Sequence, residues 1–305
     1  MSGAILRSVL QALAVLLLMT VIVFFGLHMI GNPVDTLIGP DVDQVDRLRI
    51  IKELGFDQPI WRQYLAFLNG ALHGNLGNSF VYNEPAIKLI FQRLPATLEL
   101  AFAALILAVV IGIPLGLLAG LFPENVFSRM IMTGSILGFS LPTFWIGLML
   151  IMAFSVSLGW LPSGGRGETA GLFGVQWSWL TVDGLRHLIL PALNLSLFKI
   201  SLVIRLTRAN VREVLPMDFV KFARAKGLAP LRVVLMYVLR NTLIPLVTIL
   251  GLEFGSTIAF AVVTESIFAW PGSGKLILDS INALDRPVIV AYMMVIVCLF
   301  VTLNL

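Results

Sequence analysis

Residues 216–245 read PMDFVKFARAKGLAPLRVVLMYVLRNTLIP, a basic, glycine-punctuated stretch between two long apolar runs. The whole loop between those runs, residues 207–240, holds seven Lys and Arg and two acids, a charge of 7 − 2 = +5. Loops on the cytoplasmic side of membrane proteins carry an excess of Lys and Arg. The stretch therefore predicts a cytoplasmic loop between two membrane-crossing helices.

The composition around this loop is that of a membrane protein. Apolar residues make up 58% of the 305 residues and charged residues only 12%, whereas soluble domains have about 45–50% and 25%. Several uncharged stretches are long enough to cross a hydrocarbon core of about 30 Å, which takes ~20 apolar residues. We expect an all-α polytopic membrane protein without a sizeable soluble catalytic domain.

Six apolar segments are expected to cross the membrane, at residues 8–31, 100–123, 130–165, 187–206, 242–268 and 287–305. Pro142 is expected to kink the third segment, because proline removes a helix hydrogen bond and clashes with the preceding turn. With loop 207–240 inside, the N- and C-termini fall in the cytoplasm. The polar segment 32–95 has a net charge of −1 and then faces outward.

The basic loop contains the signals of a short amphipathic helix. Asp218 is expected to cap a helix over residues 219–226, and Gly227 to end it in the left-handed conformation. Pro230 suits the first turn of a second helix. One apolar stripe with basic flanks is expected from Phe219, Phe222, Ala223 and Lys226, beside Lys221 and Arg224. Such a helix either lies on anionic lipid or docks in a groove on a partner.

Four charged residues fall inside the predicted fourth and fifth crossings. A mid-membrane acid costs roughly 2.5–3.5 kcal/mol on insertion scales, so Glu253 and Glu265 should face a cavity, a partner or an interface. We interpret Glu253 either as lining a pathway or as a structural hydrogen-bonding group, and expect Glu265 to be wet at the outer end. Lys199 and Arg205 are expected to snorkel to the cytoplasmic surface.

Glycines recur at four-residue steps in two of the predicted crossings. These are Gly112, Gly116 and Gly120 in the second crossing, and Gly134 and Gly138 in the third. Such spacing lets helices approach closely. We interpret them as helix-packing residues, with a role in gating as the alternative.

No catalytic or nucleotide-binding motif emerges from the sequence. Residues 272–275, Gly-Ser-Gly-Lys, look like the end of a phosphate-binding loop, but Ala269 and Leu276 stand where that motif requires Gly and Ser or Thr. The three histidines are too scattered to suggest a metal site, and no serine–histidine or paired-aspartate motif appears. We expect this chain to have no ATPase site, no catalytic residue, no metal and no cofactor of its own.

Sequence segments spread over nearly the whole chain resemble one transport family. ARAKGL at 223–228 and LRNTLIP at 239–245 resemble the cytoplasmic coupling loop of permease subunits of binding-protein-dependent ABC importers, in the dipeptide/oligopeptide/nickel branch. Further stretches resemble that branch in the same order: LGFDQP at 54–59, RLPATLEL at 93–100, SLPTFW at 140–145, LGWLP at 158–162, HLILP at 187–191 and FAWPG at 268–272.

The chain also departs from the family's pattern. The general coupling motif begins Glu-Ala-Ala, whereas this chain has Lys-Phe-Ala at 221–223, and Arg240 replaces the proline at the motif's end. Lys199 stands where the family has a small or apolar residue. Members continue into a short polar tail after the sixth crossing, so we expect this sequence to be truncated at Leu305.

The resemblance implies the type I ABC importer permease fold. Residues 1–94 would form the first transmembrane helix and a long periplasmic loop, and residues 95–305 the permease core with coupling loop 207–240. The residues that contact the ATPase would be Asp218, Phe219, Phe222, Ala223, Arg224, Lys226 and Gly227.

The resemblance also implies a function and a set of partners. The subunit would form half of a pathway for di- or oligopeptides in the bacterial cytoplasmic (inner) membrane. Its partners would be a second homologous permease, a substrate-binding protein, and two ATPase subunits that bind ATP and Mg. The alternatives are another solute of the branch, such as glutathione or a nickel chelate, an ion-coupled secondary transporter, or an intramembrane enzyme.

Overall fold

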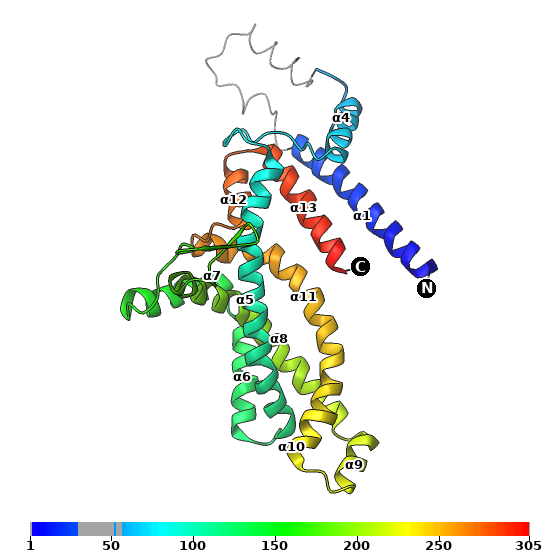
Figure 1. Cartoon of the computed structure of the whole chain (residues 1–305), viewed down its shortest axis with the longest axis vertical. Helices are drawn as coiled ribbons and strands as arrows, with labels where there is room; N and C mark the ends of the chain where they lie inside the picture. Colours follow the sequence, from blue (N-terminus) through cyan, green and yellow to red (C-terminus); the bar gives the residue numbers. More distant parts are fainter. Residues whose placement is uncertain (1, 30–51, 53–56, 305) are drawn as a thin grey trace. The chain divides into compact units, whose positions relative to one another are not determined.

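Long uncharged segments favour helices, because a helix satisfies its own backbone hydrogen bonds where no water is available. The computed structural model describes residues 2–29, 52 and 57–304, and most of them are helical. The chain divides into two compact units (Figure 1). Unit 1 combines the described parts of Met1–Leu94 and Gly272–Leu305, and unit 2 is Pro95–Pro271.

Unit 2 contains the long helices and the basic loop. Its elements are the larger part of α5 (Ala86–Leu121), α6 (Val126–Ser140), α7 (Thr143–Leu150), η1 (Ile151–Ser157), β1 (Ala170–Leu172), β2 (Val175–Trp177), α8 (Val182–Val214), α9 (Asp218–Ala225), α10 (Pro230–Val233), η2 (Val234–Leu239) and α11 (Arg240–Ile267). Helix α8 packs against both α6 and α11. The strands β1 and β2 form an antiparallel hairpin with Gly171 opposite Gln176.

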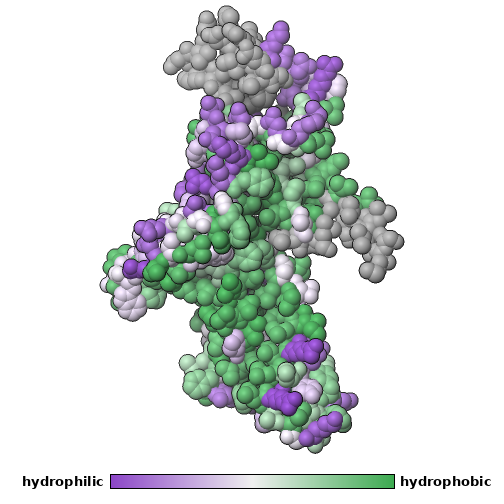
Figure 2. Space-filling model, viewed as in Figure 1, coloured by the Kyte–Doolittle hydropathy of each residue, from purple (hydrophilic) through white to green (hydrophobic). Residues whose placement is uncertain are grey.

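Three helices in the described residues are long and apolar enough to cross a membrane. They are α5, α8, and the continuous helix Pro230–Ile267 that α10, η2 and α11 form together. The side of this bundle seen in Figure 2 is mostly hydrophobic, and hydrophilic side chains gather at its α9–α10 end. The two apolar helices nearest the chain ends are shorter, Leu13–Gly26 and Arg286–Thr302.

The third predicted crossing is broken rather than kinked. Helix α6 ends at Ser140, α7 begins at Thr143, and the two parts are bent by 106°. Pro142 lies in the break, where it precedes the first residue of α7. If this bent pair counts as one crossing, the described residues contain up to four of the six predicted crossings by length and composition. The full count of six stays a prediction.

Close approach between α5 and α8 depends on the three glycines that recur at four-residue steps in α5. A Cβ added at Gly112, Gly116 or Gly120 would lie only 2.6–2.8 Å from side-chain atoms of α8, closer than real Cβ contacts. The facing residues are Val203, Thr207 and Val211 in the same order. The two glycines of α6 differ, because a Cβ at Gly138 would lie 2.7 Å from Ser201 Oγ but one at Gly134 would meet nothing within 4 Å.

Unit 1 is built around α1 (Ser2–Met29), α4 (Ile60–Leu72), α12 (Ser273–Asn282) and α13 (Arg286–Asn304). Helix α13 packs on α1 and on α12. The ring of Phe24 lies 5.3 Å from that of Tyr64, and the fully buried Asp285 accepts hydrogen bonds from Ser79 Oγ and Phe80 N. Part of the predicted outer loop, residues 32–51 and 53–56, lies outside the described residues.

Candidate functional site

The basic loop forms a compact turn-and-helix unit. Gly227 has φ +75°, which confirms the predicted left-handed position after α9, and Pro230 occupies the start of α10 as predicted. The prediction that Asp218 caps the helix was wrong. The residue at the cap is Met217, and Asp218 is the first helical residue, with its carboxylate 3.0 Å from Lys221 Nζ. The acid still suits the positive end of the helix dipole there.

Helix α9 has one buried face and one exposed apolar face. Val220 and Ala223 are buried in a valine-rich cluster that joins α9 to neighbouring elements. Its other buried members are Val211 and Val214 of α8, Val233 of α10 and Val238 of η2. Phe219 and Phe222 point away from it, with Phe222 61% exposed. The predicted single stripe was therefore wrong about Ala223, which lies on the buried face.

A basic side chain covers part of this exposed face. Lys226 Nζ lies 4.5 Å from the centroid of the Phe222 ring, within the range of a cation–π contact. Lys221 and Arg224 are exposed beside it. The face thus presents two phenylalanine rings within a positively charged border.

A π-helical segment, η2, connects α10 with α11 and was not predicted. Two polar side chains just after it bond back to its carbonyl groups, Asn241 Nδ2 to Tyr237 O at 2.6 Å and Thr242 Oγ1 to Val238 O at 2.9 Å. Such wide turns are frequently found at functional sites. Here the segment lies beside the valine-rich cluster, at the point where α9 packs onto the α10–α11 helix.

A cavity of about 450 Å³ opens in unit 2 between α8 and α11, and we call it the α8–α11 cavity. Lys199 and Glu253 form an ion pair in its wall. Ser256 Oγ joins the pair, accepting from Lys199 Nζ at 2.9 Å and donating to Glu253 Oε2 at 3.1 Å. The remaining lining residues are Thr143, Leu195, Phe198, Thr257, Phe260, Val263 and Thr264.

The predictions for the four charged residues meet different outcomes. Lys199 does not snorkel, since it is only 7% exposed and paired with Glu253. Glu265 is fully buried rather than wet. Arg205 stacks on the ring of Phe139, with its guanidinium carbon 4.4 Å from the ring centroid. Glu253 faces the α8–α11 cavity and is bonded to Lys199 and Ser256, so its role as a pathway residue stays a prediction.

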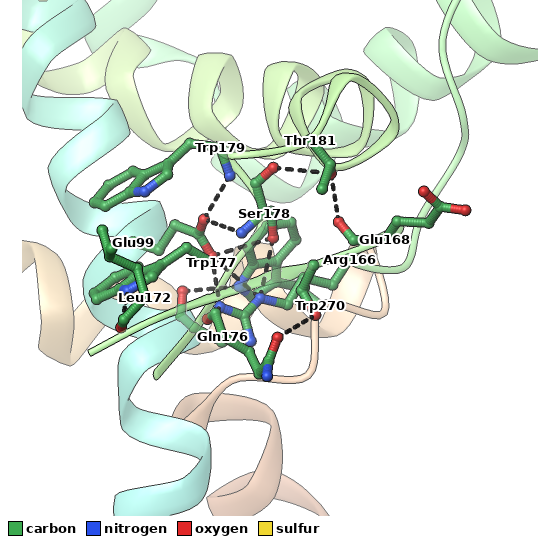
Figure 3. A network of polar contacts seen from close by, with 12 residues as sticks. Glu99, Arg166, Glu168, Leu172, Gln176, Trp177, Ser178, Trp179, Thr181 and Trp270 are labelled. Atoms are coloured by element: carbon green, nitrogen blue, oxygen red, sulfur yellow. Dashed lines mark hydrogen bonds and ion pairs between the residues drawn. The ribbon is translucent and has the colours of Figure 1, made fainter. Parts of the chain in front are cut away.

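A second polar network, which was not predicted, holds the hairpin region to α5 (Figure 3). The carboxylate of Glu99 is fully buried and accepts from the backbone amides of Ser178 at 2.6 Å and Trp179 at 3.0 Å. Arg166 also donates to it and lies over the ring of Trp270. A sequence signal was present, because an acid directly precedes the second uncharged segment and an arginine lies in the polar loop after the third.

The described residues contain no candidate metal site. Among the described residues, no group of three or more His, Cys, Asp or Glu side chains could hold a metal ion. The polar groups described above instead form ion pairs and hydrogen bonds to one another.

Long apolar helices and a basic helical loop define a multi-pass membrane protein. Residues 112–305 match the family model for the inner membrane component of binding-protein-dependent transport systems. Residues 1–101 match the model for the N-terminal part of such components. The chain belongs to this family of transport-system membrane components.

Three relatives align with most of the chain. The di/tripeptide transport system permease protein DppB of Pseudomonas aeruginosa is 39% identical, over 90% of this chain and 85% of the relative. The oligopeptide transport system permease protein AppB of Bacillus subtilis is 38% identical, over 100% and 95%. The glutathione transport system permease protein GsiC of Escherichia coli is 36% identical, over 100% and 95%. The resemblance inferred from the motifs is confirmed.

Proposed function

We propose that this chain is the permease subunit of an ATP-driven importer of small peptides. It forms half of the translocation pathway in the bacterial cytoplasmic membrane, with six crossings and both termini in the cytoplasm. A second, homologous permease supplies the other half, two cytoplasmic ATPase subunits bind ATP and Mg, and a separate binding protein delivers the substrate. Family membership and the names of the di/tripeptide and oligopeptide relatives support this assignment.

The observation that carries the coupling role is that helix α9 has one buried face and one exposed apolar face. Its exposed side presents Phe219 and Phe222 with a basic border, while its buried side packs on residues of α8, α10 and η2. A short helix of this kind fits a groove on a partner protein. ATP-driven movement of the ATPase subunits would be passed through the valine-rich cluster into the helices that line the α8–α11 cavity.

A second cargo is favoured by one relative. The glutathione permease of Escherichia coli aligns over 100% of this chain, and glutathione is itself a small peptide with free charged ends. We propose di- and oligopeptides as the principal cargo and glutathione as the second candidate.

The test is to tag the chain, extract it gently from its native membrane, and identify the co-purifying proteins by mass spectrometry. We expect a second permease, one or two ATPases, and ATP hydrolysis stimulated by peptide-loaded binding protein. A homo-oligomer without an ATPase, with uptake that follows an ion gradient, would replace this proposal with a secondary transporter.

A further inference from the structure

The α8–α11 cavity combines a suitable size with a single charged feature. Its volume of about 450 Å³ falls within the ~300–1,000 Å³ of small-molecule sites. Most of its lining is apolar or hydroxyl-bearing, and Lys199 and Glu253 are its charged side chains. A few placed polar groups in an apolar cavity are what fixes the orientation of a small ligand.

Both members of the ion pair retain hydrogen-bonding capacity. The Lys199 ammonium has three donors, and in the described part of the chain it uses two, on Glu253 and on Ser256 Oγ. The bonds described for the Glu253 side chain all involve Oε2. That side chain is 26% exposed, so its second oxygen can accept from a ligand in the cavity.

The pair also selects the charge of a ligand. A ligand with one charge that displaced one partner would leave the other charge unpaired in the wall of the cavity, which is unfavourable. A zwitterion can replace both partners at once, its carboxylate on Lys199 and its ammonium on Glu253. The cavity then carries no unpaired charge, with or without the ligand.

We propose that Lys199 and Glu253 form a binding site for the two charged ends of a short zwitterionic peptide. Lys199 binds the C-terminal carboxylate and Glu253 binds the N-terminal ammonium. An extended dipeptide spans about 7 Å, whereas the two charged groups are in direct contact, so the pair has to open for the peptide to place one end on each side chain. This inference deepens the proposed function and rests on it, because it assigns the cavity to the pathway of a peptide importer.

The first experiment measures the permease complex without its binding protein, so that selection by the binding protein plays no part. The complex of the two permeases and the two ATPases, in nanodiscs, is titrated with three probes: glycyl-phenylalanine, its N-acetyl derivative and its C-terminal amide. Binding is followed by saturation-transfer NMR, with and without vanadate-trapped nucleotide. We expect each blocked end to weaken binding to the wild-type complex about tenfold, the size of one charge-assisted hydrogen bond.

Two variants assign each end of the peptide to one residue. In Glu253→Gln, acetylation of the peptide should no longer weaken binding, whereas amidation still should. In Lys199→Met the pattern should be reversed. If the ion pair were merely structural, each variant would lower the affinity for all three probes alike. The crossed pattern therefore separates a binding role from a structural one.

The outcomes are separable from those of the proposed function. Peptide-stimulated ATP hydrolysis by the wild-type importer tests the function and does not depend on the cavity. If hydrolysis is stimulated but the wild-type complex binds the three probes equally, or binds none at millimolar concentration, the inference is overturned and the function stands. This wild-type comparison decides the matter even if a variant fails to assemble.

Discussion

Arg166 directs two hydrogen bonds at one oxygen of Glu99: Nη2 and Nε lie 2.7 and 3.1 Å from Oε2. The other oxygen, Oε1, accepts hydrogen bonds from the backbone amides of Ser178 and Trp179. Arg166 also donates to the Gln176 carbonyl. One buried carboxylate at the start of the second apolar segment thereby fixes the position of the hairpin and of the chain that leads into α8.

Replacing Glu99 with Ala should destabilise unit 2. The change leaves Arg166, whose side chain is 14% exposed, beside unpaired amides, and breaking such a buried pair costs about 3–5 kcal/mol. Thermal unfolding in detergent measures the effect. The matched control is Glu124→Ala, which removes an ion pair to Arg129 whose side chains are 91% and 71% exposed. Equal shifts for the two variants would contradict the assigned role.

Replacing Gly116 with Ala should separate α5 from α8. The new Cβ would lie 2.6 Å from Thr207 Cβ and 2.7 Å from Ile204 O, and overpacking of this kind costs roughly 1–3 kcal/mol. Gly134→Ala is the control, since its Cβ meets nothing within 4 Å. A helix-interior Ala there should be neutral or favourable by up to about 1 kcal/mol. Gating rather than packing would be indicated if Gly116→Ala changed transport without changing stability.

Replacing Gly227 with Val should uncouple transport from ATP hydrolysis while the protein stays in the membrane. At φ +75° a β-branched residue is strained, so the turn after α9 would shift and misplace Phe219 and Phe222. Uptake and ATP hydrolysis are measured together. Gly74→Val is matched in strain, with φ +73° and open space around it, and should leave coupling intact. Normal uptake in Gly227→Val would remove the loop from the mechanism.

Replacing Phe222 with Ser should weaken the attachment of the ATPase subunits. The ring is exposed on the apolar face of α9, and loss of an aromatic anchor costs about 2 kcal/mol or more at an interface. Co-purification of the ATPase at increasing detergent stringency measures this. Lys88→Ala, which removes only a surface ion pair to Glu84 outside α9, should retain nearly full association. If the two variants behaved alike, an interfacial helix lying on lipid would be the better interpretation.

Much of this molecule could be predicted from its sequence because the signals are local. Uncharged length predicts the long helices, and the positions of Gly227 and Pro230 predict where α9 ends and α10 begins. The family resemblance was predictable for a similar reason, since its motifs are short and occur in a fixed order.

Most of the failures concern contacts between segments distant in sequence. Lys199 and Glu253 are 54 residues apart, so neither position alone reveals that the two charges pair. The sequence therefore predicted that the lysine reaches the membrane surface instead. The Glu99 network depends in the same way on a residue 67 positions later. Ala223 was misplaced because heptad-like spacing cannot tell which side of a short helix faces the protein.

Helix α8 joins the two ends of unit 2. It begins next to the Ser178 and Thr181 segment that Glu99 anchors, and its last residues, Val211 and Val214, lie in the cluster under α9. The stretch from Pro191 to Val214 is about 35 Å long at 1.5 Å per residue. If this stretch tilts as a rigid unit by 5° about Pro191, its other end at Val214 moves by roughly 3 Å. Lys199, a third of the way along, would move by about one ångström relative to Glu253 of α11, enough to loosen the hydrogen bond between them.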